Sequence, residues 1–107
     1  MLPIVQKVAK EYKEGLQRLY GDELVELILF GSYARDNANE ESDLDFAIVL
    51  RSPDTRAAAE IPKISFVGSR LSLKYGIMFS SLATSFDKKQ TSIQGIYQEI
   101  RKEGIVI

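Results

Sequence analysis

Residues 24–50 read LVELILFGSYARDNANEESDLDFAIVL, and this stretch carries the clearest structural pattern in the chain. Its two ends, Leu24–Phe30 and Leu44–Leu50, are short runs of branched and aromatic side chains, which is typical of largely buried β-strands. Gly31 ends the first run, and a polar segment from Asp36 to Ser42 separates it from the second. We therefore predict two neighbouring strands joined by a polar loop.

The sequence on either side of this stretch predicts helices and a further strand. Apolar residues recur at helical spacing over Pro3–Tyr20, which predicts a first helix that ends at Gly21. The segment Arg56–Leu73 predicts a second helix, with Pro62 either in its first turn or dividing a short entry turn from the main helix. A third strand is expected over Tyr75–Leu82.

The C-terminal segment predicts one more helix, which Gly104 would cap and which would begin in solvent near Lys88 and Lys89. Its core face is expected to consist of Ile93, Ile96, Tyr97 and Ile100. The final residues 105–107 either add a strand or simply pack their apolar side chains, and three residues leave both alternatives open. The order of elements predicts the α+β class, with helices packed on a small mixed β-sheet.

Length and composition limit the protein to ordinary globular classes. The chain has 107 residues, which predicts a single domain over residues 1–107, and 45% of them are hydrophobic. Fourteen basic and fifteen acidic residues give a formal charge of -1, so we expect no direct binding of nucleic acid and no attraction to a membrane. The N-terminus lacks a signal-peptide pattern and no apolar run approaches about 20 residues, which predicts a cytoplasmic protein.

Two residue types are missing, and their absence removes several kinds of catalysis. The chain has no cysteine and no histidine. Thiolate nucleophiles, cysteine-ligated zinc and histidine-based acid–base couples are therefore excluded. The remaining chemistry is that of carboxylates with a hard cation such as Mg²⁺, which indicates phosphate-containing substrates.

The residues that suit this chemistry lie at the two inner ends of the predicted strands. Because side chains alternate along a strand, Asp43 and Asp45 should point to the same face with Cα atoms about 6.5 Å apart, where both carboxylates can share Mg²⁺. Gly31 allows a sharp turn and a close approach to a ligand, and Ser32 begins a turn whose free N–H groups suit phosphate oxygens. Arg35 either pairs with a phosphate or fixes the loop, and we slightly favour the second role, through Asp36 or Glu40.

Each of these features alone has an ordinary structural explanation. A Gly-Ser pair after a strand is most often only a turn, and Ser42-Asp43 can be a turn with a capping carboxylate. Asp45, however, leads directly into an apolar strand, where an unpaired carboxylate is costly to bury. Taken together, the residues favour a metal and nucleotide site.

The combined motif resembles a known family. Gly31-Ser32-Tyr33-Ala34-Arg35, followed by Ser42-Asp43-Leu44-Asp45, is similar to the signature of minimal nucleotidyltransferases of the DNA polymerase β-like superfamily. Length, element order and the closing Glu103-Gly104-Ile105 resemble MntA-type antitoxins, which are paired with HEPN-domain toxins. The fit covers nearly the whole chain and implies the minimal polymerase β-like fold.

The resemblance implies transfer of AMP from Mg²⁺-bound ATP, or of another nucleotide from its triphosphate, to a tyrosine hydroxyl of a HEPN toxin. By position, Gly31 and Ser32 would bind the triphosphate, Ser42 would shape the adjoining loop, and Asp43 and Asp45 would hold Mg²⁺ as the catalytic carboxylates. In this reading Mg²⁺ is the cofactor and the nucleotide and the toxin are the partners.

The chain departs from the family pattern in two places. Asp36 stands where a glycine commonly follows the Ala-Arg pair. The predicted third strand has no carboxylate, and Gly76 is expected at the position where many relatives carry aspartate. Two functions follow: an active adenylyltransferase, or a catalytically impaired antitoxin that neutralises its partner by contact alone.

Overall fold

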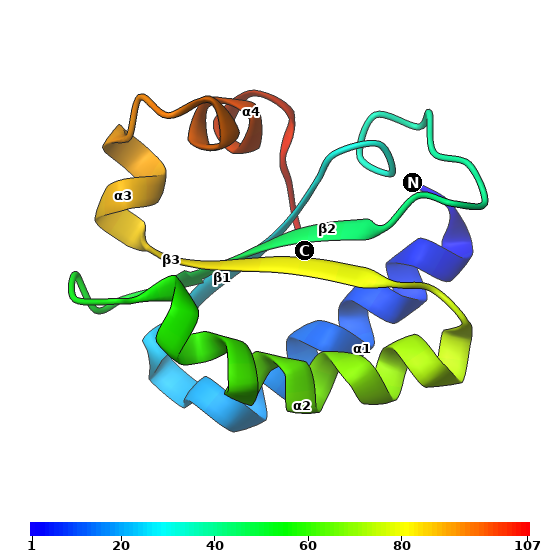
Figure 1. Cartoon of the computed structure of the whole chain (residues 1–107), viewed down its shortest axis with the longest axis horizontal. Coiled ribbons are helices and arrows are strands. Elements are labelled where there is room, and N and C mark those ends of the chain that lie inside the picture. The colour runs from blue at the N-terminus through cyan, green and yellow to red at the C-terminus, as the bar shows by residue number, and fades with distance from the viewer.

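The computed structural model describes residues 1–107 as a mixed β-sheet with helices on both faces (Figure 1). The helices are α1 (Pro3–Tyr20), α2 (Ala57–Tyr75), α3 (Phe86–Thr91) and α4 (Gly95–Glu103), with a 3₁₀ turn over Gly21–Glu23. The strands are β1 (Leu24–Phe30), β2 (Leu44–Leu50), β3 (Phe79–Ser85) and β4 (Ile105–Val106). They lie in the order β3-β2-β1-β4, with β2 and β3 parallel and the other pairs antiparallel. The predicted α+β class is confirmed.

The sheet separates two apolar layers, and helices cover both. In Figure 1, α1 and α2 lie on one side of the sheet and α3 and α4 lie on the other. On the first side, Leu27, Leu29 and Phe46 pack with α1 residues such as Tyr12. On the second side, the alternate strand residues Ile28, Phe30, Ala47 and Val49 pack with Tyr97 and Ile100 of α4. Because most of both faces of β1 and β2 is buried, these strands are nearly continuous apolar runs in the sequence, each with one carboxylate, Glu26 in β1 and Asp45 in β2.

An aromatic cluster joins α1 to the sheet. The ring of Tyr12 lies 5.0 Å from that of Phe46 and 4.9 Å from that of Phe79, between ring centroids. The hydroxyl groups of Tyr12 and Ser81 form a hydrogen bond of 2.8 Å. Tyr12 is fully buried, and burial raises the pKa of its phenol to about 12. The hydrogen bond therefore satisfies a neutral hydroxyl that has no access to water.

The first helix and the first two strands begin and end at the predicted residues. The predictions for Pro62 were wrong, because α2 runs without interruption through Pro62 in its second turn. Pro62 cannot donate the N–H that would bond the carbonyl of Ala58, and because Ala58 is exposed, that carbonyl is accessible to water instead.

The predicted third strand was wrong in position. Tyr75 is the last residue of α2, and Gly76 caps that helix with a left-handed φ of 68°, donating its N–H to the carbonyl of Ser72 at 2.8 Å. Strand β3 begins only at Phe79. Tyr75 and Ile77 pack against the first apolar layer from the helix end, so their apolar character does not mark a strand.

The predicted last helix is in fact two. Ser85 caps the short α3 by accepting the N–H of Lys88, and Ile93 lies in the following loop, 85% exposed. Of the four predicted core residues, Tyr97 and Ile100 are buried, whereas Ile96 is 41% exposed. Residues 105 and 106 form β4, which pairs with β1 and resolves the two alternatives in favour of a strand.

Gly104 follows α4, as predicted, but it is not left-handed, with φ of −66°. A Cβ at this position would overlap the Ile28 side chain and the Ile100 carbonyl, so glycine is required by close packing between α4 and β1. No helix of the chain combines the length and apolar character needed to cross a bilayer.

Candidate active site

The site lies where β1 ends and β2 begins. Phe30 stands opposite Asp45 in the antiparallel ladder, which places Gly31 next to the aspartate. A Cβ on Gly31 would overlap Oδ2 of Asp45 and lie 3.1 Å from its Cγ, and Gly31 has a left-handed φ of 78°. Glycine is therefore required here twice, by its backbone conformation and by the adjacent carboxylate.

The chain turns tightly after Gly31. The N–H of Arg35 donates to the carbonyl of Gly31 at 3.1 Å, and the N–H of Asn37 donates to that of Ser32 at 3.0 Å. The N–H groups of Ser32, Tyr33 and Ala34 make no hydrogen bond within the chain. Successive free N–H groups in a turn form a concave donor surface that suits phosphate oxygens.

Ser42 shapes the loop that leads into β2. Its Oγ accepts the N–H of Asn39 at 3.0 Å, and its own N–H donates to the Asn39 carbonyl at 3.1 Å. The Oδ1 of Asn39 accepts the N–H of Glu41 at 2.8 Å. These bonds fix the backbone immediately before Asp43.

The two aspartates differ in their surroundings. Asp43 is exposed in the loop just before β2, and Asp45 is partly buried two residues further along, inside the strand. Burial raises the pKa of the Asp45 carboxyl above its ordinary 3.8, and the negative charges of Asp43 and then Glu99 raise it further, while Arg35 opposes them. A cation at this position would remove the cost of ionising Asp45.

Strand β3 determines what faces Asp45 from the other side. In the parallel ladder Asp45 pairs with Ser80, and Ser80 is exposed on that face. The sequence of β3, FSSLATS, has no carboxylate. Gly76 was the wrong position for comparison, because it caps α2 and does not belong to the strand.

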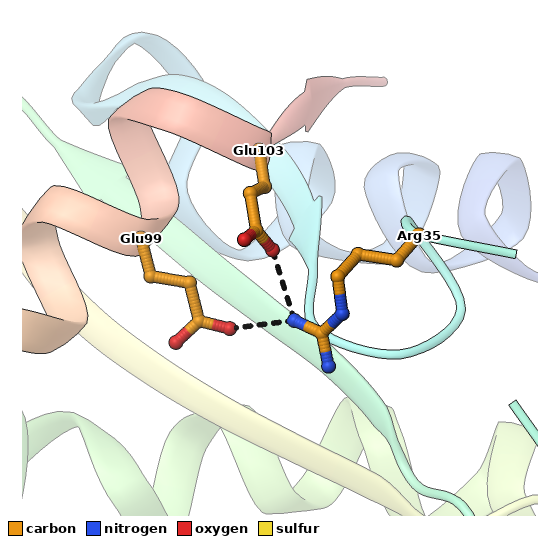
Figure 2. A network of polar contacts seen from close by, with 3 residues as sticks. All are labelled: Arg35, Glu99 and Glu103. Atoms are coloured by element: carbon orange, nitrogen blue, oxygen red, sulfur yellow. Dashed lines mark hydrogen bonds and ion pairs between the residues drawn. The ribbon is translucent and has the colours of Figure 1, made fainter. Parts of the chain in front are cut away.

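Arg35 ties the turn to α4. Its Nη1 lies 3.0 Å from Oε1 of Glu99 and 2.9 Å from Oε2 of Glu103, and Figure 2 shows both carboxylates converging on this one nitrogen. The expected partners of Arg35, Asp36 and Glu40, are not used. A loop-fixing role is therefore present, but through the last helix.

The sequence of this chain was compared with protein families and with known proteins, and both comparisons identify its family. The model of the nucleotidyltransferase domain family matches residues 9–106, which is most of the chain. The chain belongs to the nucleotidyltransferase domain family. The protein named "Putative protein adenylyltransferase MJ0141" of Methanocaldococcus jannaschii is 35% identical over 101 residues, covering 94% of this chain and 96% of that protein. A second protein of the same organism, "Putative protein adenylyltransferase MJ0604", is 29% identical over 95% of this chain and 96% of its own length.

Solved structures share the fold of this nucleotidyltransferase domain. A toxin–antitoxin crystal structure with AMP-PNP aligns with a TM-score of 0.61 at 17% identity, covering 89% of this chain and 68% of that one. A mutant of the toxin–antitoxin MntA–HpeT aligns with a TM-score of 0.56, also at 17% identity, covering 92% of this chain and 70% of that one. At 17% identity these two structures show that the chain has the same fold, and nothing more specific.

The donor set of this nucleotidyltransferase suits a metal that arrives with its substrate. No group of three or more carboxylates in the chain is close enough to form a complete metal site. Mg²⁺ commonly takes one or two protein carboxylates together with substrate phosphates and water. Asp43 and Asp45 beside free N–H donors fit that arrangement.

The surface also has grooves away from the β1–β2 end. Two grooves of about 530 and 550 Å³ flank α2. The larger is lined mostly by apolar side chains, and its only titratable residue is the buried Tyr12. The other groove is lined by charged side chains, among them Glu11, Glu14 and Arg70, so the choice of the β1–β2 end as the candidate site rests on its free N–H groups and its two aspartates and not on groove size.

Sequence reasoning missed Glu99 and Glu103 as neighbours of the site. Two glutamates four residues apart on a helix resemble a solvent-exposed face. Only the contact with Arg35 distinguishes them. No local pattern in the sequence pairs these glutamates with Arg35, which lies 64 and 68 residues away from them.

Proposed function

We propose that this chain is an antitoxin-type protein adenylyltransferase, with residues 1–107 as its nucleotidyltransferase domain. It transfers AMP from Mg²⁺-bound ATP to a tyrosine hydroxyl of a HEPN-domain toxin in the cytoplasm. The curated relatives support adenylyl transfer to protein, and the toxin–antitoxin structures of the same fold support this class of partner. The observation that carries the proposal is the contact between Gly31 and the Asp45 carboxylate, which joins the phosphate-binding turn to the acidic pair.

In this proposal, different residues bind the phosphates and the metal ion. The free N–H groups of residues 32–34 bind phosphate oxygens, and the two N–H-bearing nitrogens of Arg35 that no carboxylate occupies add further donors. Asp43 and Asp45 hold Mg²⁺, which when bound neutralises charge on the phosphates.

The transfer itself is a single displacement at the α-phosphorus. The acceptor hydroxyl oxygen bonds to that atom while the bond to pyrophosphate breaks, pyrophosphate leaves with the electron pair, and the hydroxyl proton passes to solvent or a base. Positioning and charge neutralisation supply most of the catalysis in such transfers.

The test is transfer of label. With ATP labelled in its α-phosphate, Mg²⁺ and the toxin encoded beside this chain, label should appear on the toxin and be lost when its acceptor tyrosine becomes phenylalanine. Asp43→Asn and Asp45→Asn should each abolish transfer, while Asp54→Asn, which changes an exposed aspartate in the β2–α2 connection, should not. Transfer that persists in both site variants refutes the metal assignment.

The composition of β3 favours a second candidate function. Strand β3 has no carboxylate and its Ser80 pairs with Asp45, which supports a chain without a strand-borne general base, and such a base contributes about 10²–10⁴-fold. In this alternative the fold binds nucleotide and neutralises the toxin by contact. Full protection by an Asp43→Asn/Asp45→Asn double variant at equal dose supports contact, and loss of protection by the folded variant excludes it.

Ser80→Asp separates the two candidates further. A carboxylate there would face the proposed metal site, and we expect transfer to rise by at least about tenfold if the missing base limits the reaction. Ser69→Asp adds the same charge at an exposed serine of α2, on the other side of the sheet, and is the control. Equal transfer by Ser80→Asp and the unmodified protein would show that the chain does not lack a strand carboxylate for turnover.

A further inference from the structure

The last helix carries two carboxylates that no step of the proposed transfer uses. Glu99 and Glu103 are four residues apart, so they lie one turn apart on the same face of α4. Both contact Nη1 of Arg35, and neither contacts Nε or Nη2 (Figure 2). The guanidinium is thus held from one side, with its other donors left free.

The helix that holds Arg35 is itself firmly fixed. Tyr97 and Ile100 are buried against the sheet, and the hydroxyl of Tyr97 accepts a hydrogen bond of 3.0 Å from Oγ1 of Thr84. Directly after α4, Gly104 packs against Ile28 and β4 joins the edge of β1. Glu99 and Glu103 therefore project from a rigid support.

The turn that carries Arg35 packs Tyr33 and Ala34 against the first apolar layer, but the exposed Arg35 side chain has no such packing. The other ion pair of the turn is the 3.9 Å contact between the N-terminal ammonium and Asp36, whose side chain is 70% exposed. The position of the Arg35 guanidinium relative to the sheet thus depends mainly on α4. A long arginine side chain left without partners would sample many rotamers.

We propose that Glu99 and Glu103 are positioning residues of the nucleotide site, which hold Arg35 by one nitrogen and present its remaining donors to the triphosphate. This inference rests on the proposed function, because it requires that the site binds a nucleoside triphosphate. It extends the site from the β1–β2 end to α4. The ordinary alternative is that the two ion pairs only fasten a surface loop to a helix.

The test measures nucleotide affinity and thermal stability separately. The binding probe is Mg²⁺ with a non-hydrolysable ATP analogue, titrated calorimetrically at physiological salt, where direct repulsion beyond about 8 Å is largely screened. Glu99→Gln and Glu103→Gln should each weaken binding by roughly two- to fivefold, as expected for partly exposed ion pairs. Glu40→Gln removes the same charge from an exposed loop residue with no ion pair and should leave affinity unchanged.

Repeating the glutamate substitution in an Arg35→Ala variant distinguishes a positioning role from a role that only attaches the loop to the helix. In Arg35→Ala, the glutamates have no guanidinium to hold and present only negative charge to the triphosphate. Glu103→Gln should therefore leave binding unchanged or tighten it in Arg35→Ala, whereas it weakens binding in the parent. A role limited to fastening the loop would lower Tm in both ion-pair variants without changing affinity, and that result overturns the proposal.

The other possible results of the binding titrations also support or contradict the positioning role. Tighter binding by Glu99→Gln or Glu103→Gln in the parent would mean that the carboxylates compete with nucleotide for Arg35, which contradicts positioning. If the parent chain binds the nucleotide and the glutamate variants bind it equally well, only this inference fails. If the parent chain does not bind Mg²⁺–nucleotide at all, the proposed function fails and this inference fails with it.

Discussion

Replacing Gly31 by alanine should damage the site far more than its small size suggests. At φ of 78° an alanine pays about 1–2 kcal/mol for a left-handed backbone. Its Cβ would also overlap Oδ2 of Asp45, and forcing that side chain from its rotamer costs about 0.5–1.5 kcal/mol more. We expect a loss of roughly 2–3 kcal/mol in the free energy of unfolding, which for a domain of this size lowers Tm by roughly 10–20 °C.

The displaced carboxylate gives the prediction its functional part. A displacement of about 1 Å at a reacting centre can cost about 10²-fold, so Gly31→Ala should lose adenylyl transfer and Mg²⁺–nucleotide binding even well below its Tm. Gly76→Ala is the matched control, because Gly76 has a similar φ of 68° but no atom within 4 Å of the added Cβ. It should lose about 1–2 kcal/mol and keep its nucleotide affinity. A folded Gly31→Ala protein that binds nucleotide as the parent does would refute this view of the site.

Two further predictions concern pH and the core. Because the folded state raises the pKa of Asp45 above 3.8, this group stabilises the fold fully only below that pH, and the stabilisation is lost as pH rises through the raised value. Asp45→Asn should therefore have a higher Tm than the parent at pH 7 without Mg²⁺, and the difference should disappear in titrations taken to acid pH; a lower Tm at pH 7 contradicts the sign. Tyr12→Phe removes the 2.8 Å bond to Ser81 and should cost about 0.5–1.5 kcal/mol in urea unfolding. Ser81→Ala should add little on top of it, and fully additive losses would show that the bond contributes nothing.

Local patterns in the sequence were sufficient wherever an element could be recognised without its neighbours. Strands β1 and β2 are apolar on both faces, and α1 has an apolar stripe, so their limits followed from periodicity alone. The apolar residues of β3 are Phe79, Leu82 and Ala83, and its other four residues are serine or threonine. The end of the preceding helix is also apolar, so the sequence has no clear boundary between the two elements. The strand can begin only after the left-handed cap at Gly76 has ended α2, and apolar periodicity does not predict that cap.

The candidate site divides in the same way. Gly31, Ser32, Asp43 and Asp45 are separated by one loop, so the strand-loop-strand pattern predicted their proximity. Ser80 becomes relevant only through the parallel register of β3 on β2, which depends on contacts between distant parts of the chain. Glu99 lies 64 residues from its partner Arg35, and no local signal sets that distance. What the sequence could not predict is therefore the part that the sheet order and the docking of α4 create.

The energetics of Asp45 argue that its role is functional. A carboxylate that served as a turn cap or a structural ion-pair partner would have its charged form favoured by the fold and its pKa lowered. Here burial, Asp43 and Glu99 all disfavour the charge, and only Arg35 supports it. The adjacent Gly31 leaves room for this carboxylate at the cost of a left-handed backbone. A bound cation would favour the charge on Asp45 that burial, Asp43 and Glu99 disfavour, and this is why we propose that Mg²⁺ arriving with the nucleotide offsets the cost of placing Gly31 and Asp45 side by side.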